Sequence, residues 1–126
     1  MAQILLVEPD IKLGKVYSQF LIDQGNEVSW RTTAQSALTS VDEQTPDLII
    51  LELQLAAHNG IEFLYEFRSY KDWQVIPVLI HSQVPPLLKA ISPMLWDQLG
   101  IVGYLYKPAT KLRDLARSVE KVLVPA

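Results

Sequence analysis

The chain has 126 residues, of which 49% are apolar and 20% charged, so we expect one globular domain spanning residues 1–126. It contains no cysteine, which excludes disulfide bonds, thiolate metal sites and cysteine nucleophiles. The net charge of −3 argues against nucleic-acid binding, and every apolar run is too short to cross a membrane, so we expect a cytoplasmic protein.

Short apolar runs alternate with segments of helical spacing along the whole chain. We predict, in chain order, a strand at residues 3–7, a helix at 11–24, a strand at 27–31, a helix at 33–41, a strand at 48–51, a helix at 61–68, a strand at 75–81, a helical segment at 84–99, a strand at 104–106 and a helix at 112–122. This alternation predicts an α/β fold with a doubly wound parallel sheet. Alternation alone does not choose between the two common strand orders.

Capping residues and apolar spacing define the helices further. Asp10 is a good helix N-cap and Gly25 is typical of a helix end, so we expect the first helix between them. Its buried face is predicted at Leu13, Val16, Tyr17, Phe20 and Leu21. The buried face of the last helix is predicted at Leu112, Leu115, Val119 and Val122. In the second strand, Val28 and Trp30 are expected on one face of the sheet.

Prolines and glycines interrupt the second half of the chain. Pro93 cannot lie inside a straight helix, and Ser92 followed by proline is typical of a new helix start. We therefore expect the helical segment at 84–99 to be broken or kinked. Gly100 and Gly103 are expected to bracket a turn into the last strand.

The stretch at residues 46–60 carries the clearest functional signal. Its apolar run at 48–51 is unbroken, which is typical of a strand covered on both faces. Glu52 follows at the expected carboxyl end of this strand, where open α/β sheets bind their ligands. We therefore expect Glu52 to be the centre of the functional site.

Four motifs resemble those of response-regulator receiver domains, the CheY-like superfamily. They are ILLVEPD at 4–10, PDLIILELQLAAHNG at 46–60, IPVLIHS at 76–82 and GYLYKPA at 103–109. The resemblance implies a flavodoxin-like (βα)5 three-layer sandwich whose parallel sheet has the strand order 2-1-3-4-5. It also places Glu52 at the phosphoacceptor position, Ser82 and Tyr104 at the switch positions, and Lys107 and Pro108 at the family's lysine–proline pair.

The sequence departs from the family pattern at the residues that bind metal and phosphate. Family members carry an aspartate pair after the first strand, of which the second binds Mg²⁺; here the pair is Glu8–Pro9. Glu52 is one methylene longer than the usual acceptor aspartate, and Gln54 keeps only a backbone carbonyl for the metal. Phosphoryl transfer depends on positioning and on Mg²⁺, so we predict a pseudo-receiver without cofactor, metal or enzymatic activity.

Two alternatives remain open at this point. In the first, the chain is a working receiver that a histidine kinase phosphorylates on Glu52, with Mg²⁺ held by Glu8, Asp10, Glu52 or Gln54. In the second, it is a flavodoxin-like module for a small ligand. The loop after the first strand, however, lacks the glycines and hydroxyl residues that would hold a phosphate.

Lys107 is expected to meet Glu52 directly. The pair could be purely structural, or Glu52 could imitate a phosphorylated aspartate and fix an active-like surface. Without a phosphoryl group, we expect Ser82 to be a strand-end serine and Tyr104 a half-buried tyrosine. We expect His81 to fill the end of the fourth strand and His58 to lie in solvent.

A partner surface is predicted around the fourth helix, at Leu88, Ile91, Leu95 and Trp96. The resemblance implies that the fourth helix, fifth strand and fifth helix bind targets or form a homodimer. Alternatively, the prolines fold this segment back and its apolar groups enlarge the core. Arg113, Arg117 and Lys121 recur every four residues on the last helix and are expected to form a solvated face.

The function predicted from the sequence is that of a receiver-like domain in a two-component or phosphorelay-type bacterial pathway. It is expected to act through a protein partner, either a histidine kinase or a downstream signalling protein. The start of the sequence and its short tail favour a stand-alone domain.

Overall fold

The computed structural model describes residues 2–55, 59–85 and 93–123. Its elements are β1 (Gln3–Val7), α1 (Ile11–Asp23), β2 (Glu27–Arg31), α2 (Ala34–Glu43), β3 (Leu48–Leu51), α3 (Gly60–Arg68), the 3-10 turn η1 (Lys71–Trp73), β4 (Val78–Ser82), α4 (Pro93–Leu99), β5 (Ile101–Tyr106), the 3-10 turn η2 (Lys107–Ala109) and α5 (Leu112–Leu123). The strands form one parallel sheet in the order β2-β1-β3-β4-β5. The predicted α/β fold and strand order are therefore confirmed.

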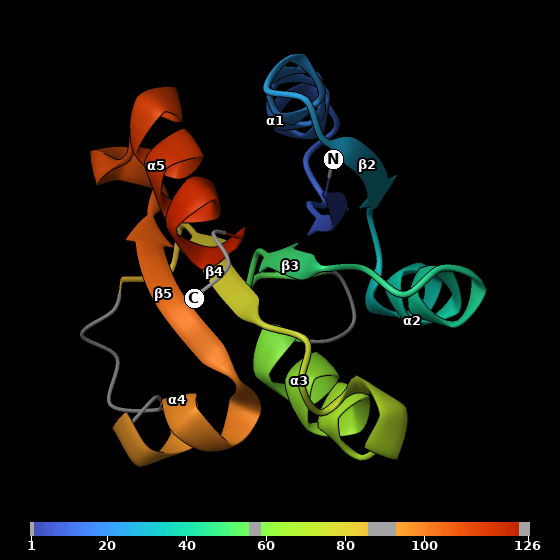
Figure 1. Cartoon of the computed structure of the whole chain (residues 1–126). Coiled ribbons are helices and arrows are strands. Elements are labelled where there is room, and N and C mark those ends of the chain that lie inside the picture. Colours follow the sequence, from blue (N-terminus) through green and yellow to red (C-terminus); the bar gives the residue numbers. More distant parts are fainter. Residues whose placement is uncertain (1, 56–58, 86–92, 124–126) are drawn as a thin grey trace.

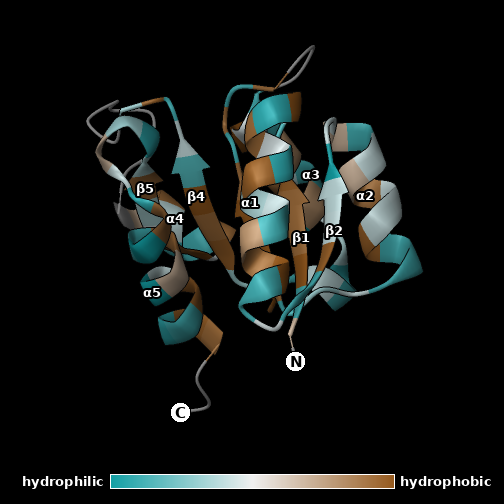
Figure 2. Ribbon diagram, turned by 90° about the horizontal axis from the view of Figure 1, so that it is seen from above, coloured by the Kyte–Doolittle hydropathy of each residue, from teal (hydrophilic) through white to brown (hydrophobic). Residues whose placement is uncertain are grey.

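Helices cover both faces of the sheet, as a doubly wound fold requires. Figure 1 shows α1 and α5 on one face and α2, α3 and α4 on the other. The strands lie between these two helical layers, and Figure 2 shows β1 and most of β4 in the brown of hydrophobic residues, whereas β2 is paler. Within the described residues, no helix combines the length and the apolar character that crossing a membrane would require.

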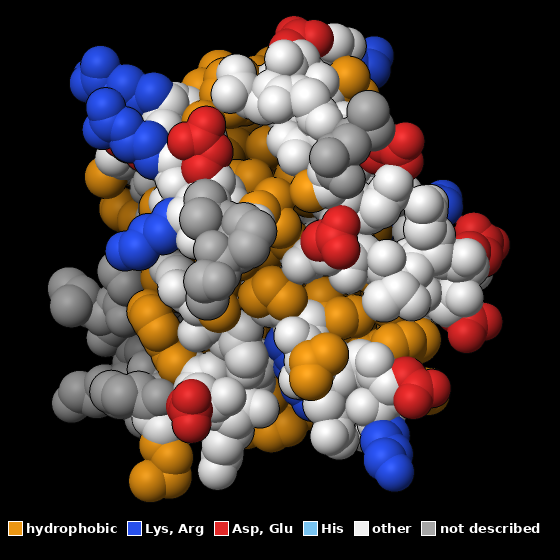
Figure 3. Space-filling view, in the orientation of Figure 1, with side chains coloured by type: hydrophobic (Ala, Val, Ile, Leu, Met, Phe, Trp, Pro, Cys, Tyr) orange, Lys and Arg blue, Asp and Glu red, His pale blue; other side chains and the backbone are white. Residues whose placement is uncertain are grey.

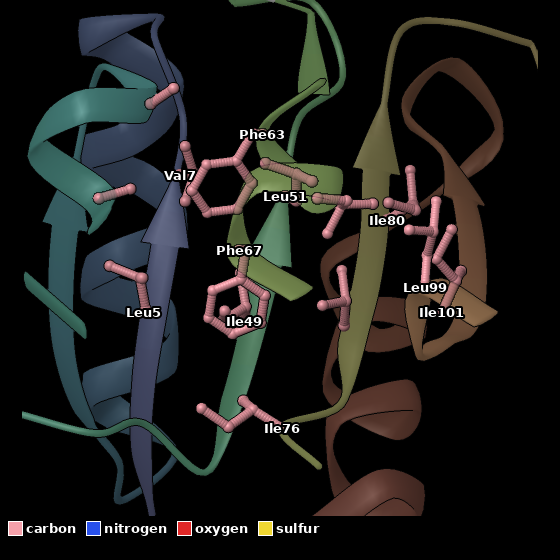
Figure 4. Close-up of a cluster of buried hydrophobic side chains, with 14 of the residues drawn as sticks. Leu5, Val7, Ile49, Leu51, Phe63, Phe67, Ile76, Ile80, Leu99 and Ile101 are labelled. Atoms are coloured by element: carbon pink, nitrogen blue, oxygen red, sulfur yellow. The ribbon is translucent and has the colours of Figure 1, made fainter. Parts of the chain in front are cut away.

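Two hydrophobic clusters, one on each face of the sheet, hold the layers together. The first packs Phe63 and Phe67 of α3 onto β1, β3 and β4, where both rings are almost completely buried. Figure 4 shows these rings among aliphatic side chains from the strands and from the α4–β5 connection. The second cluster packs Leu21 of α1 and Leu115 of α5 against the opposite face. Burying a Leu or Phe side chain contributes about 1.5–3 kcal/mol.

The first helix begins and ends where its capping residues predict. Asp10 caps α1, because its Oδ1 accepts the Leu13 N–H at 2.9 Å, and Gly25 after its end has a φ of 97°. The predicted buried face is wrong at Val16, whose side chain is 49% exposed. Val16 instead lines a cleft between α1 and the start of α5. Val28 and Trp30 of β2 pack on the second cluster, as predicted.

The strands β4 and β5 start at other positions than the sequence predicts. β4 begins at Val78 and not at residue 75, because the turn η1 extends into a backbone hydrogen bond from Ile76 N to Trp73 O. β5 begins at Ile101, so Gly103 lies inside a strand and not in a turn. A Cβ on Gly103 would come within 2.9 Å of Leu79 Cδ1, and the register between β4 and β5 shifts at this point. A larger residue at this position would displace the end of the buried Leu79 side chain.

The fourth helix starts at Pro93, which agrees with the predicted new start. Val84 and Pro85 are not helical, and residues 86–92 lie outside the described residues. Gly100 follows α4 with a φ of 70°, a conformation that glycine adopts without strain. The predicted new helix start is thus confirmed, whereas the helical pattern predicted for Val84 and Pro85 is wrong, and the break itself lies outside the described residues.

Candidate functional site

Four chemically active side chains meet at the carboxyl edge of the sheet. Glu8, Glu52 and Ser82 stand at the ends of β1, β3 and β4, and Lys107 follows β5. Because parallel strands end at the same edge, their last residues converge. All four side chains are almost completely buried: 2% of the Glu8, 3% of the Glu52 and 6% of the Lys107 side chain is exposed, and Ser82 is fully enclosed.

The Lys107 ammonium bridges the two carboxylates. Its Nζ lies 2.5 Å from Glu8 Oε1 and 2.7 Å from Glu52 Oε1. We call Glu8, Glu52 and Lys107 the acid–lysine cluster. The predicted contact between Glu52 and Lys107 is confirmed. The second contact, with Glu8, was not predicted, although the position of Glu8 at the end of the neighbouring strand could have indicated it.

Glu52 is saturated with hydrogen bonds. Its Oε1 also accepts the Gln83 N–H at 3.1 Å, and its Oε2 accepts the Gln54 N–H at 3.0 Å and the Ser82 hydroxyl. A carboxylate offers about four lone-pair positions, and here four donors converge on them. The two backbone donors, Gln54 and Gln83, were not predicted, because backbone donors leave no mark in the residue type.

The pKa values of the cluster follow from burial and from these hydrogen bonds. Burial raises the pKa of Glu8, and the hydrogen bond from Lys107 offsets only part of this rise. Burial acts on Glu52 in the same sense, but hydrogen bonds from Lys107 and Ser82 outweigh it and hold the pKa of Glu52 below its ordinary value. Burial would lower the pKa of Lys107, but its hydrogen bonds to both carboxylates raise it. Glu8 is therefore the carboxylate that takes up a proton first.

Asp10 and Gln54, which the sequence offered as metal ligands, do not place their side chains beside those of Glu8 and Glu52. Asp10 is exposed and its carboxylate caps α1, while its N–H donates to Glu8 Oε2 at 3.2 Å. The Gln54 side chain is exposed, and its backbone pairs with Asn59. Across the described ranges, no three acidic or histidine side chains gather closely enough to hold a metal ion.

Ser82 and Tyr104 connect the cluster to the loop after β4. The Ser82 hydroxyl donates to Glu52 and accepts the Val84 N–H at 3.0 Å. The half-buried Tyr104 donates its hydroxyl to the Val84 carbonyl at 2.5 Å, and its ring stacks on Trp96 with centroids 5.9 Å apart. The prediction that Ser82 is only a strand-end serine is therefore wrong, because its hydroxyl is hydrogen-bonded to Glu52. Pro108, next to Lys107, is exposed in η2.

One of the two histidines, His81, belongs to the described part of the chain. His81 is 4% exposed and meets the Tyr17 ring edge-on, so the prediction that it fills the end of the strand is confirmed. Burial lowers the pKa of His81 to about 4, and the nearby charge of Lys107 acts in the same direction. His58 lies outside the described residues.

The predicted partner surface is described only in part. Leu95 and Trp96 are half-buried and pack against the first hydrophobic cluster, which supports the alternative that this segment enlarges the core. Leu88 and Ile91 lie outside the described residues. Met94, on the same short helix, is 72% exposed.

The basic side chains of α5 form an exposed face, as predicted. Arg113, Arg117 and Lys121 are all exposed, and Figure 3 shows Lys and Arg side chains gathered at the corner of the molecule that α5 occupies in Figure 1. Leu115 and Val119 lie buried on the other side of the helix, whereas Leu112, at its first residue, is 38% exposed.

The site can be compared with known proteins. The chain is 32% identical over 109 residues to the alginate biosynthesis transcriptional regulatory protein AlgB of Pseudomonas syringae, covering 86% of this chain and 23% of that protein. It is 32% identical over 121 residues to the regulatory protein VanRB of Enterococcus faecalis, covering 96% of this chain and 52% of that protein. The chain therefore spans about half or less of these two relatives.

Solved structures of similar size share the fold. The chemotaxis protein CheY4 of Vibrio cholerae superposes with a TM-score of 0.86 at 25% identity, covering 98% of this chain and 99% of that one. The non-phosphorylated receiver domain of HemR from Leptospira biflexa gives a TM-score of 0.83 at 23% identity, covering 100% and 97%. A family model described as the response regulator receiver domain matches residues 4–120. The chain therefore belongs to the response regulator receiver domain family.

Proposed function

We propose that this chain is a pseudo-receiver, a cytoplasmic domain of two-component signalling that works by binding a protein and not by accepting a phosphoryl group. Its partner is a histidine kinase or a downstream signalling protein. The acid–lysine cluster carries this proposal, because Lys107 is already bound by Glu8 and Glu52 in the pocket where receivers hold metal and phosphate. In this proposal the chain is a binding module and not an enzyme.

The residues of the pocket do not fit Mg²⁺. An octahedral Mg²⁺ site needs one or two free carboxylates, but Lys107 Nζ lies against both Glu8 Oε1 and Glu52 Oε1. Pro9 offers no side-chain ligand, and the carboxylate of Asp10 is engaged at the start of α1. A metal ion would have to displace a buried ammonium that neutralises the same two carboxylates.

The hydrogen bonds of Glu52 support a second part of the proposal, that this residue stands permanently in place of a phosphorylated aspartate. In a receiver, the phosphoryl group draws the switch hydroxyl inward; here the Ser82 hydroxyl donates to Glu52 Oε2. Tyr104 in turn donates to the Val84 carbonyl, on the loop that follows Ser82 and β4. The surface around α4 and β5 is then held in one state without modification.

The test is a titration of the intact chain with Mg²⁺ and beryllofluoride, followed by tryptophan fluorescence. Trp30 reports on the pocket because its Nε1–H donates to the Glu8 carbonyl at 2.9 Å. We expect no saturable change. The matched variant Pro9→Asp with Glu52→Asp restores the family's acidic pattern and should gain a saturable response.

A saturable response of the unmodified chain at millimolar Mg²⁺ would contradict the proposal and support a working receiver. If neither protein responds, the restored carboxylates are not sufficient, and the explanation based on Pro9 and Glu52 is wrong.

A further inference from the structure

A second site lies between α1 and the start of α5, on the face of the sheet opposite α4. A cleft of about 220 Å³ opens there over the end of β4. Its walls include Val16, Tyr17, Leu112 and Leu115, together with Thr110, whose hydroxyl donates to the Tyr106 carbonyl. Figure 2 shows β4 between α1 and α5, which places the floor of the cleft on the sheet.

The floor of this cleft holds a buried imidazole. His81 lines the cleft, although only 4% of the residue is exposed. Its ring meets Tyr17 edge-on with centroids 4.7 Å apart, and neither ring nitrogen is hydrogen-bonded to any residue in the described part of the chain. The ring nitrogens are not among the described side-chain atoms that are both fully buried and unpaired, so solvent reaches them. The imidazole is therefore available to a ligand.

The chemistry of the floor favours a hydrogen-bonding group and not a cation or an anion. Burial lowers the pKa of His81 to about 4, so the ring is neutral at pH 7. A neutral imidazole offers one N–H donor and one acceptor nitrogen. A hydroxyl group, which can both donate and accept, matches either nitrogen.

The volume of the cleft and the residues at its mouth further restrict the class of ligand that can bind. A cavity of about 150 Å³ holds one benzene ring, so this cleft has room for one ring with small substituents. Aliphatic side chains and Tyr17 offer that ring apolar contacts. Lys111 is exposed at the mouth and attracts a negative charge. Asp114, whose Oδ2 accepts the Lys111 backbone N–H at 2.8 Å, carries a negative charge that offsets part of this attraction.

We propose that the cleft binds a small aromatic acid with a hydroxyl group at one end and a carboxylate at the other, of the hydroxybenzoate class. The ring packs between α1 and α5, the hydroxyl meets His81, and the carboxylate meets Lys111. The proposal does not rest on the pseudo-receiver function, because no residue of the acid–lysine cluster lines the cleft.

The test is a titration of the full chain with 4-hydroxybenzoate, followed by NMR of the His81 ring proton, with the His58 ring as an internal reference. We expect a saturable shift of His81 alone. Benzoate, which lacks the hydroxyl, should bind about tenfold more weakly, the loss expected for one hydrogen bond. Phenol, which lacks the carboxylate, should also bind more weakly.

Variants locate the binding. Val16→Trp should block the cleft, while Ile22→Trp on the same helix, at a residue that is 45% exposed and outside the cleft, should leave binding unchanged. In His81→Phe, followed through the Leu115 methyl groups, 4-hydroxybenzoate and benzoate should bind equally. The proposal is overturned if His81 shows no saturable shift, if both tryptophan variants bind alike, or if benzoate binds the unmodified chain as tightly as 4-hydroxybenzoate.

Discussion

Lys107 lies between two buried carboxylates, and its ammonium is what allows both to stay ionised inside the protein. Charges removed from water are costly unless each is paired and hydrogen-bonded. Here Glu52 receives four hydrogen bonds, whereas Glu8 receives one from Lys107 and one from the Asp10 N–H. The energetic role of each residue follows from this asymmetry.

Removing the ammonium should destabilise the fold. In Lys107→Ala two buried carboxylates face each other without a cation, and breaking such a buried pair costs about 3–5 kcal/mol. We expect a loss of this size in the free energy of unfolding, measured by chemical denaturation. The exposed Lys111→Ala should change stability by less than about 0.5 kcal/mol.

The triple change Glu8→Gln, Glu52→Gln and Lys107→Met removes every charge of the cluster and should recover most of the stability lost in Lys107→Ala. A single variant Lys107→Ala as stable as the unmodified chain would show that the cluster is solvated and that Lys107 is not its organising residue.

The two carboxylates should contribute to the pH dependence of stability with opposite signs. The pKa of Glu52 is lowered below 4.5, so its contribution is present above pH 4.5 and is lost as the pH falls through the lower folded-state pKa. The stability difference between the unmodified chain and Glu52→Gln should therefore shrink below pH 4.5.

The pKa of Glu8 is raised above 4.5, so the folded state binds its proton more tightly than the unfolded state does. Glu8 therefore favours folding more as the pH falls through its raised pKa, and Glu8→Gln should lose this gain. Denaturation of both variants between pH 3 and pH 7 measures the two trends; parallel curves for both variants would contradict the assignment.

At the scale of elements, Arg68 hydrogen-bonds to three segments that lie outside the strands of the sheet. Standing at the end of α3, its guanidinium donates to the carbonyls of Leu99 at 2.8 Å, Trp73 at 2.5 Å and Ile76. These carbonyls belong to the end of α4, to η1 and to the approach to β4. A Cβ on Gly100 would come within 2.2 Å of this guanidinium, so the glycine makes room for it.

Arg68→Ala leaves these carbonyls without their donor and should cost about 2–3 kcal/mol of unfolding free energy. Arg68→Lys should recover only part of the loss, because one ammonium cannot reach all three carbonyls. Arg113→Ala, at an exposed residue of α5, is the matched control. Faster hydrogen exchange should be confined to η1, the approach to β4, α4 and the start of β5; a uniform change would show that Arg68 acts on the whole fold.

The same elements show what could be predicted from sequence. Apolar runs and caps located β1, α1 and β3 to within two residues, because local spacing determines these elements. The start of β5 was missed because Gly103 looks like a turn residue, and only the nearby Leu79 side chain shows why a glycine stands inside the strand. Val16 was wrongly placed for a similar reason, since its exposure depends on how far α5 lies from α1.

For the whole molecule, the sequence predicted which residues lie close together more successfully than it predicted their hydrogen bonds. The contact between Glu52 and Lys107 followed from the resemblance to receivers, because the family fold brings these strand ends together. Glu8 also reaches the Lys107 ammonium, because its side chain is one methylene longer than the aspartate of the family pattern. The spacing of residues along the sequence does not reveal such a contact. The cleft above His81 likewise depends on the separation of α1 and α5, two elements far apart in the sequence.

Taken over the whole chain, the cleft above His81 and the acid–lysine cluster are neighbours that meet at Tyr17. Tyr17 forms a wall of the cleft above His81, and its ring centroid lies 5.9 Å from Lys107 Nζ. The acid–lysine cluster lies at the carboxyl edge of the sheet. The domain thus combines a family pocket closed by its own lysine with a separate opening between α1 and α5.

Incubation with acetyl phosphate and Mg²⁺, followed by intact-mass measurement, tests most directly whether Lys107 has closed the receiver pocket to phosphorylation. We expect the mass of the unmodified chain to stay constant, while the Pro9→Asp, Glu52→Asp variant gains one phosphoryl group. A phosphoryl group on the unmodified chain that is absent from Glu52→Gln would contradict the pseudo-receiver.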